Sequence, residues 1–344
     1  MKLFFPKFAF IKNKKTGKYA FSLTSLNKTR IFSTERVSEI KKWSKQVMPL
    51  CVITNLTQDF DITKNLGKGN FSVVHLGVRK KSSEEFAIKS IDKEKIQNKL
   101  DSIESIINEI KTLRKLNHPH IIKLYEVYET ELYIHLVFEY LRGGELFDQI
   151  DERGIFSEQE AQSLIKSMLQ TLKYMHNLGI IHRDLKPENI ILQNHDDLLS
   201  YKIADFGLSC FCMPGEKMTI RCGSAGFVAP ESLNKEGYNC KADIFSLGII
   251  SHILLTGIPP FQKNTYKETL MANKDCVLNF EHEMWNNVSI EAKYFIKEVT
   301  LRDPEKRPNA AQAIENPWFK LKLKKSESIF ELVELSNAIQ AKYE

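Results

Sequence analysis

The sequence predicts an α+β fold made of two lobes, a small β-rich lobe followed by a larger α-helical lobe. Strand patterns separated by loops follow one another through residues 60–139. After Gly143-Gly144 the pattern changes to helix and stays mostly helical to about residue 319. A β-rich part followed by an α-rich part indicates two lobes with a cleft between them. The segments we expect are residues 1–50, 60–319 and 320–344.

Residues 1–50 are predicted to form a small unit with two strands and one helix. Alternation over residues 19–24 has the period of a strand, and residues 30–33 are a second candidate. Thr34 lies near the expected start of the helix. The apolar face of that helix is expected to consist of Val37, Ile40, Trp43 and Val47. So short a segment buries little core by itself.

The elements of residues 60–319 follow from periodicity and capping residues. Apolar residues at helical spacing predict one amphipathic helix within the β-rich part. Ser157 is placed to cap the first long helix of the second lobe. In chain order we expect a strand, glycine turn and strand at 60–75, a strand at 85–91, the amphipathic helix at 102–116, strands at 121–128 and 133–139, and the long helix at 158–176.

Composition and charge narrow the class of protein. The net charge is +6, but lysine and arginine are spread along the chain rather than gathered in one arm, so we expect no nucleic-acid partner. The six cysteines contain no C-x-x-C pair, which favours reduced thiols over a zinc site or a disulfide framework. No apolar run approaches the ~20 residues of a membrane span. We expect a cytoplasmic protein.

A glycine-rich turn is the first candidate binding element. It comprises Leu66, Gly67, Lys68 and Gly69, and Val74 follows on the next strand. Glycine lets the backbone approach a ligand without a Cβ clash, and its N–H groups can face phosphate oxygens. By itself the turn is equally consistent with an ordinary hairpin. It is not a P-loop, because no G-K-S/T follows.

Charged residues downstream of this turn complete a possible anion site. Ala87-Ile88-Lys89 lies on the next strand, where the lysine can reach a phosphate. Glu109, on the amphipathic helix, could hold the Lys89 ammonium in place. A lone strand lysine or helix glutamate is more often a solvated charge, so this interpretation depends on the motifs that follow.

The segment from His182 to Asn189 carries the most chemical information. Transfer of a phosphoryl group requires an oriented hydroxyl, neutralised phosphate oxygens and a fixed metal. Asp184 can accept the hydroxyl proton, and Lys186 can neutralise the moving group. Asn189 offers a hard oxygen suited to Mg²⁺, and Asp205 of Asp205-Phe206-Gly207 offers a second.

Together these motifs resemble the eukaryotic protein kinase family. The ordered set is G-x-G, A-I-K, H-R-D-L-K-P-E-N, D-F-G and A-P-E, and it extends over about residues 60–319. The third glycine of the usual turn is Ser72 here. The resemblance implies the bilobal protein kinase fold, with ATP and Mg²⁺ as cofactors and proteins as substrates.

The resemblance also implies roles for individual residues. Lys89 would bind the α- and β-phosphates and pair with Glu109, and Lys186 would contact the γ-phosphate. Asp184 would be the catalytic base. The remaining implied roles are metal binding for Asn189 and Asp205, a gatekeeper for Phe138, an adenine-binding hinge for Glu139 to Leu141, an anchor of the catalytic loop for Asp243, and a clamp of the large lobe for Glu231 with Arg307.

Subgroup features resemble calcium/calmodulin-dependent and calcium-dependent Ser/Thr kinases. Lys186 and Ser224 are similar to Ser/Thr rather than tyrosine kinases, and the run from Gly143 to Asp148 matches the calcium-related group. In that group a glutamate at the position of Glu145 often pairs with a substrate arginine, with help at Glu188. This implies a preference for basic substrates. The alternative is that Glu145 binds only the ribose hydroxyls.

The activation segment, residues 205–231, lacks the threonine that many relatives phosphorylate. That position holds Ile220, and Thr219 is one residue out of register. Arg183 therefore lacks an obvious phosphate partner. We predict that activity does not require phosphorylation of this segment.

The flanking segments give weaker signals. Residues 19–47 resemble the last strands and helix of a pleckstrin-homology domain, which would make membrane phosphoinositide contact possible; the alternative is an extension packed on the small lobe. The tail has four lysines from Lys320 to Lys325 and then an apolar stretch at Ile329, Leu332, Val333 and Leu335. Calmodulin binding is one hypothesis for it, and a capping helix is the other.

Two other functions are alternatives for a sequence of this kind. A pseudokinase or scaffold would bind ATP or protein without catalysis, but such proteins normally lose catalytic positions that are all retained here. A small-molecule phosphotransferase of similar fold is the second rival. The A-P-E segment, Asp243 and Arg307 favour a protein substrate, because these elements build a peptide-docking platform.

Overall fold

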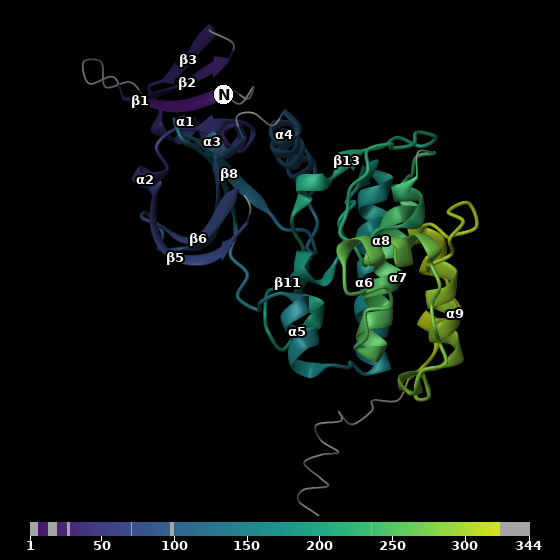
Figure 1. The fold of residues 1–344 in the computed structure, drawn as a ribbon. Helices are drawn as coiled ribbons and strands as arrows, with labels where there is room; N and C mark the ends of the chain where they lie inside the picture. The colour runs from purple at the N-terminus through teal and green to yellow at the C-terminus, as the bar shows by residue number, and fades with distance from the viewer. Residues whose placement is uncertain are drawn as a thin grey trace, which may run out of the picture. The chain divides into compact units, whose positions relative to one another are not determined.

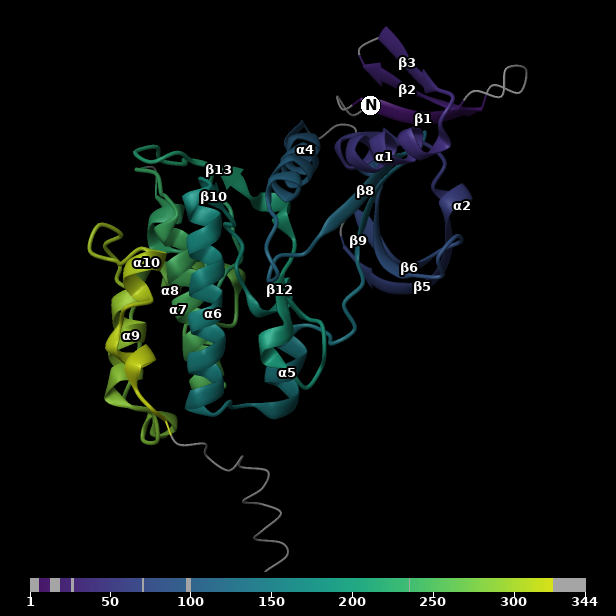
Figure 2. The same ribbon diagram turned by 180° about the vertical axis from the view of Figure 1, so that it is seen from behind.

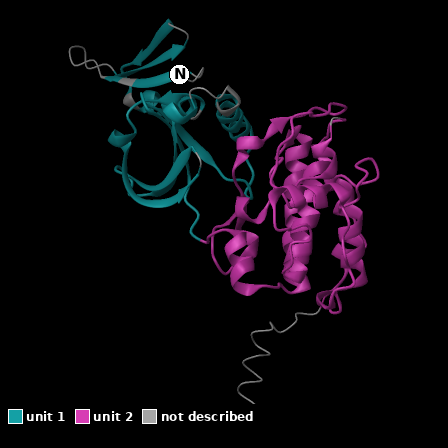
Figure 3. Ribbon diagram, in the orientation of Figure 1, with its two compact units in different colours: residues 1–142 teal, residues 143–344 magenta. Residues whose placement is uncertain are grey.

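A computed structural model describes residues 6–12, 19–25, 28–69, 71–96, 100–234 and 236–323. The chain divides into two compact units, Met1–Arg142 and Gly143–Glu344 (Figure 3). The first is rich in strands and the second is largely helical (Figure 1). This is the predicted α+β fold with a β-rich first part and a helical second part.

Unit 1 is built on one nine-stranded sheet with the strand order β3-β2-β1-β4-β8-β9-β7-β6-β5. The strands are β1 (Lys7–Lys12), β2 (Tyr19–Ser25), β3 (Lys28–Thr34), β4 (Val52–Ile53), β5 (Phe60–Lys68), β6 (Ser72–Arg79), β7 (Glu85–Asp92), β8 (Leu124–Glu129) and β9 (Tyr133–Glu139). The helices are α1 (Val37–Val47), α2 (Leu56–Asp59), α3 (Lys93–Ile96) and α4 (Leu100–Lys115). The strands expected at 60–75, 85–91, 121–128 and 133–139 and the helix at 102–116 are therefore confirmed.

The N-terminal segment contains the expected strands and helix, but one prediction about its core was wrong. Helix α1 begins at Val37 and buries Ile40, whereas Trp43 is 43% exposed. Ser44 is buried instead, and its hydroxyl donates to the carbonyl of Lys41. The helix is therefore rotated so that a small polar residue, not the tryptophan, meets the sheet.

The strands of this segment pair directly with the others. β1 is antiparallel to β2 and parallel to the short strand β4, with Phe8 opposite Ile53. β4 is also parallel to β8, where Ile53 lies opposite Tyr128. Residues 7–53 thus extend the sheet formed by β5 to β9, which fits the alternative of an extension packed on the small lobe.

Unit 2 is organised around helix α7 (Lys241–Thr256), in which every residue from Ala242 to Thr256 is buried. A helix that is apolar on all sides forms the centre of a helical core. Gly248 permits close packing there, because a Cβ at this position would come within 2.6 Å of Thr300. The long helix α6 (Glu158–Asn177) lies beside α7 (Figure 2).

The other elements of unit 2 surround this centre. The predicted capping of α6 is confirmed, because the Ser157 hydroxyl accepts a hydrogen bond from the N–H of Glu160. The helices besides α7 are α5 (Leu146–Arg153), α6 (Glu158–Asn177), α8 (Tyr266–Asp275), α9 (Ile290–Val299) and α10 (Ala310–Ala313), and the short strands are β10 (Ile180–Ile181), β11 (Ile190–Leu192), β12 (Tyr201–Ile203) and β13 (Cys210–Phe211).

Three further sequence features concern the cysteines, membrane spans and the C-terminal tail. All six cysteines are free thiols, as the sequence predicted. No helix in the described ranges is long and apolar enough to cross a membrane. The apolar tail from Ile329 to Leu335, with Lys324 and Lys325, lies outside the described residues.

Candidate active site

The glycine turn of unit 1 joins two antiparallel strands. Gly67 lies opposite Val74, and the N–H of Gly69 donates to the carbonyl of Ser72 at 2.8 Å. A Cβ added to Gly67 would meet no described atom within 4 Å, and its backbone does not have a positive φ. Since neither packing nor backbone conformation requires glycine at 67, the open space fits a ligand that approaches the backbone closely.

The residues predicted to surround a nucleotide base share one face of the sheet. Val74 on β6 lies directly opposite Lys89 on β7, and Ala87 lies opposite Phe138 on β9. Paired residues project to the same face, and residues two apart on a strand do so as well. Leu141, at the end of the expected hinge, is 9% exposed. Strand pairing therefore brings Val74, Ala87, Lys89 and Phe138 to one face of the sheet.

The predicted pair of Lys89 and Glu109 is present within unit 1. The Lys89 ammonium lies 3.0 and 3.1 Å from the two carboxylate oxygens of Glu109. Glu109 is 3% exposed and is carried by α4. The contact holds the ammonium over the sheet face that also carries Val74 and Ala87.

The two predicted metal ligands of unit 2 flank one short hairpin. β11 and β12 pair so that Ile190 lies opposite Ile203, which puts Asn189 and Asp205 at the same end. The N–H of Ala204 donates to the carbonyl of Asn189 at 2.8 Å and closes this end. Antiparallel pairing therefore brings together two residues that are 16 positions apart.

The donor set at this hairpin fits a hard divalent cation. The side-chain amide of Asn189 donates its N–H groups to the carbonyl and a carboxylate oxygen of Asp184, at 2.8 and 3.2 Å. No hydrogen bond is made to Asn189 Oδ1 within the part of the chain that the structure describes. The exposed carboxylate of Asp205 adds a second oxygen. Two oxygen ligands, with nucleotide phosphates and water completing the shell, are typical of Mg²⁺ sites.

Asp184 lies at the centre of a polar network. One carboxylate oxygen accepts a hydrogen bond from the Ser224 hydroxyl at 2.7 Å. The other lies 3.8 Å from the Lys186 ammonium and accepts from Asn189. These contacts fix the position of the Asp184 carboxylate beside the Lys186 ammonium.

The backbone around Asp184 is anchored by a buried carboxylate. Asp243 accepts hydrogen bonds from the N–H groups of His182 and Arg183, both at 2.9 Å, and from the ring of His176. Burial alone would raise the pKa of Asp243, but the hydrogen bond and charge of His176, with His182, lower it overall. The anchor predicted from the sequence is thus present and ionised.

A buried ion pair joins two distant segments of unit 2. Arg307, 1% exposed, contacts the two carboxylate oxygens of Glu231 at 2.5 and 3.0 Å. Its remaining N–H groups donate to the carbonyls of Leu301 and Lys241. The predicted clamp is therefore formed, and every donor of the guanidinium group has a partner.

An acidic cluster lies beside the catalytic loop. Glu145 precedes α5 as its capping residue, and its pKa is raised by burial and by the charges of Asp148 and Glu188, with Lys186 acting in the opposite direction. One carboxylate oxygen of Glu188 is buried and has no hydrogen-bond partner among the described residues. Three carboxylates therefore lie close enough to influence one another, with Lys186 as a neighbouring cation.

Sequence reasoning missed one residue of the site, Tyr238. Its hydroxyl donates to the carbonyl of Ile220 at 2.7 Å and accepts from the Arg183 guanidinium at 3.1 Å. The Cys222 thiol lies 3.4 Å from the same hydroxyl. Burial strongly raises the pKa of Tyr238, so the hydroxyl stays protonated. Nothing in the local sequence distinguishes this tyrosine from the other ten.

Comparison with known proteins agrees with this geometry. The chain matches the protein kinase domain family over residues 60–319. Myosin light chain kinase A of Dictyostelium discoideum is 40% identical over 268 residues, which are 78% of this chain and 90% of that protein. Calcium-dependent protein kinase 17 of Arabidopsis thaliana is 40% identical over 262 residues, 76% of this chain and 49% of that protein. A probable serine/threonine-protein kinase 2 of Plasmodium falciparum (isolate K1 / Thailand) is 40% identical over 262 residues, which are 76% of this chain and 50% of that protein.

The fold and the family match together define a protein kinase, a class of protein that generally requires ATP and a divalent metal ion. The chain belongs to the protein kinase family. It is a serine/threonine protein kinase and is similar to the myosin light chain and calcium-dependent kinases. It spans about half the length of the last two relatives described above. The family match covers residues 60–319, and the resemblance of residues 19–47 to a pleckstrin-homology domain finds no support.

Proposed function

We propose that the chain is an active kinase that transfers the γ-phosphoryl group of Mg-ATP to serine and threonine hydroxyls of proteins. The observation that carries this proposal is the network around Asp184. Its carboxylate is held by Ser224 and Asn189 and is placed beside the Lys186 ammonium. An ionised carboxylate in this position can accept the proton of a substrate hydroxyl.

Other residues would bind and orient the reactants. Lys89, held by Glu109, would bind the nucleotide phosphates, and Lys186 would neutralise charge on the transferred group. Asn189 and Asp205 would hold Mg²⁺, which supplies electrostatic neutralisation of the phosphate oxygens when it is bound. Pseudokinases normally lose one or more of these groups, and each of them is present in this chain.

The test is transfer of labelled phosphate from Mg-ATP into a degenerate peptide library. Labelled serine or threonine with no labelled tyrosine would support the proposal. A folded chain that binds nucleotide and labels no peptide would support the pseudokinase instead.

We propose further that the substrates carry a basic residue three positions before the phosphoacceptor. The acidic cluster of Glu145, Asp148 and Glu188 supports this, since a substrate guanidinium would offset the mutual repulsion of the three carboxylates. Phosphoinositide and calmodulin contacts remain predictions.

Replacing Glu188 by glutamine should reduce the preference for arginine over alanine at that substrate position by about tenfold, because a hydrogen bond to a charged group contributes about 1.5 kcal/mol. The loss should appear in KM for the arginine peptide. Glu152→Gln is a matched control, because it removes an exposed charge from α5 in the same unit. If the two substitutions reduced the arginine preference equally, the preference would arise from the net charge of the unit rather than from a specific contact of Glu188.

Activity is proposed not to require phosphorylation of the activation segment. No ion pair within the described residues involves Arg183, whose guanidinium instead donates to the carbonyl of Leu208 and the hydroxyl of Tyr238. Because Tyr238 also donates to Ile220, a neutral hydroxyl joins the catalytic loop to the activation segment. A phosphate would make a comparable link by charge.

Tyr238→Phe, which removes only this hydroxyl, should lower kcat about tenfold, whereas Thr219→Ala should leave it unchanged. Tyr201→Phe is the control, because Tyr201 is also buried in unit 2 and its hydroxyl bonds to Ser167 and Thr171. Steady-state kinetics and Tm should separate loss of positioning from loss of stability. Dependence of the wild type on a Thr219 phosphate would refute the proposal.

A further inference from the structure

The N-terminal segment closes the free edge of the catalytic unit's sheet. β4 lies between β1 and β8, and the N–H of Val52 donates to the carbonyl of Pro6 at 2.8 Å. Without β4, the outer edge of β8 would expose unpaired backbone groups. Residues 7–53 lie outside the family match, so this pairing is an addition to the kinase domain.

The apolar cores on the two sides of this junction are continuous. Ile53 and Leu56 pack in one buried cluster with residues of β5, β7, β8 and β9. Phe8, Phe21, Ile40 and Cys51 form a second cluster. Met48 packs against both clusters. Continuous packing transmits displacement from one part to the other, because protein interiors leave few voids.

Helix α4 is tied directly to the added segment. The guanidinium of Arg114, in the last turn of α4, donates to the carbonyl of Cys51 at 2.7 Å. Cys51 is 2% exposed. Burial lowers the pKa of Arg114 to about 10, and the carbonyl contact is made well inside unit 1. Glu109 lies five residues earlier on the same helix, about 7.5 Å along its axis.

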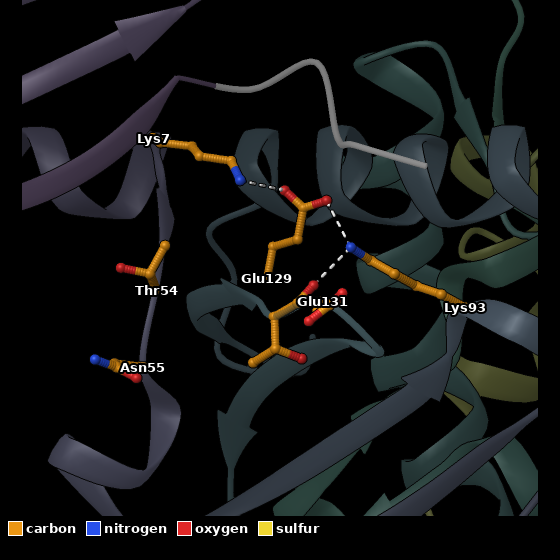
Figure 4. A pocket seen from close by; sticks show the side chains of 7 residues that line it. Lys7, Thr54, Asn55, Lys93, Glu129 and Glu131 are labelled. Carbon is orange, nitrogen blue, oxygen red and sulfur yellow. Dashed lines mark hydrogen bonds and ion pairs between the residues drawn. The ribbon is translucent and has the colours of Figure 1, made fainter.

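A second tie joins the segment to the strand that carries Lys89. Lys93 is the first residue of α3 and directly follows β7. Its ammonium lies 2.8 Å from the carboxylate of Glu129, and Lys7 of β1 approaches the same carboxylate at 3.4 Å (Figure 4). Lys93 also donates to the carbonyl of Thr130 at 2.7 Å. These groups line a cavity of about 600 Å³ with Thr54 and Asn55 from the loop after β4.

We propose that residues 7–53 act as a built-in clamp on α4, with Arg114 as the positioning residue that keeps Glu109 on Lys89. The two ties hold the two elements that carry this ion pair, α4 through Arg114 and β7 through Lys93. A displaced α4 would lose the Arg114 contact and the Glu109 contact together, since both lie on one rigid helix. The proposed clamp rests on the proposed kinase function only in experiments that measure kinase activity.

The test compares Arg114→Met with Arg79→Met in the full chain. Arg79 is a second partly buried arginine of unit 1, and it pairs with Glu126 and lies over Phe60 and Phe86 rather than on α4. Arg114→Met should lower kcat about tenfold and accelerate amide hydrogen exchange in residues 106–115. Arg79→Met should lower Tm without either effect. Equal kcat losses in the two variants, or unchanged exchange in α4, would overturn the proposal.

Arg114→Lys provides a second variant that keeps a cationic donor and is expected to fold. It should restore kcat to within about threefold of the wild type, with α4 exchange between that of the wild type and Arg114→Met. Arg114→Lys could instead show wild-type hydrogen exchange in α4 together with a kcat as low as that of Arg114→Met. That result would contradict the proposal that Arg114 positions Glu109 through α4. An inactive wild type would refute the proposed phosphoryl transfer, and the exchange measurements would still test the clamp.

Discussion

Replacing Asp184 by asparagine should lower kcat for peptide phosphorylation by about 10²–10⁴-fold, the usual contribution of a positioned general base. The amide has nearly the same shape and can still accept the hydrogen bond from Ser224, but it cannot take the substrate proton. The measurement is steady-state transfer of labelled phosphate from Mg-ATP to a peptide identified in the library.

Nucleotide binding and stability separate this chemical effect from a structural one. Asp184→Asn should bind Mg-ATP with nearly the wild-type Kd and should retain the wild-type Tm, because Asp243 continues to hold the loop backbone through His182 and Arg183. Ser224→Ala, which removes a partner but keeps the carboxylate, should reduce kcat much less. A kcat of Asp184→Asn within tenfold of the wild type would remove Asp184 from the role of base.

Replacing Arg307 by methionine should destabilise unit 2 by about 3–5 kcal/mol, because the Glu231 carboxylate would remain buried without its partner. Loss of the two carbonyl contacts, at Leu301 and Lys241, adds to the effect. Urea denaturation followed by tryptophan fluorescence can measure this, since Trp285 and Trp318 are both buried in unit 2. We expect activity to fall at temperatures where the variant is partly unfolded.

The neighbouring lysine offers a control of the same charge. Lys306 makes only an exposed contact of 3.9 Å with Asp303, so Lys306→Met should change stability by less than about 0.5 kcal/mol. The double substitution Arg307→Met with Glu231→Leu should recover part of the loss, because it removes the unpaired charge as well. An Arg307→Met variant as stable as Lys306→Met would show that the ion pair does not hold the unit together.

The motifs identified the main residues of the site because their chemistry is local. Asp184, Lys186 and Asn189 lie within six positions, so one loop brings them together. Pairing across the β11–β12 hairpin then places Asp205 beside Asn189. Tyr238 was missed because its role depends on a hydroxyl that reaches Ile220 and Arg183, 18 and 55 positions away.

Helical periodicity was a weaker guide in the N-terminal segment. The pattern placed Trp43 on the buried face of α1, yet Ser44 occupies that position and Trp43 is exposed. Residues that are one position apart on a helix differ by about 100° in direction, so the orientation of the helix decides which of the two faces the sheet. Which of the two is buried depends on the strands packed below, and a single-helix pattern contains no information about those strands.

The sequence by itself determined the order of elements, the serine/threonine kinase class and the pairs Lys89–Glu109 and Glu231–Arg307. The element order and the class follow from periodicity and short motifs, whereas the two pairs, whose members are 20 and 76 positions apart, were implied by the resemblance to the kinase family. Only the tertiary structure decided that residues 7–53 join the catalytic sheet and that Arg114 binds the Cys51 carbonyl. A backbone carbonyl carries no side-chain signature, and an edge strand of two residues has no readable period, so their partners become defined only when the chain has folded.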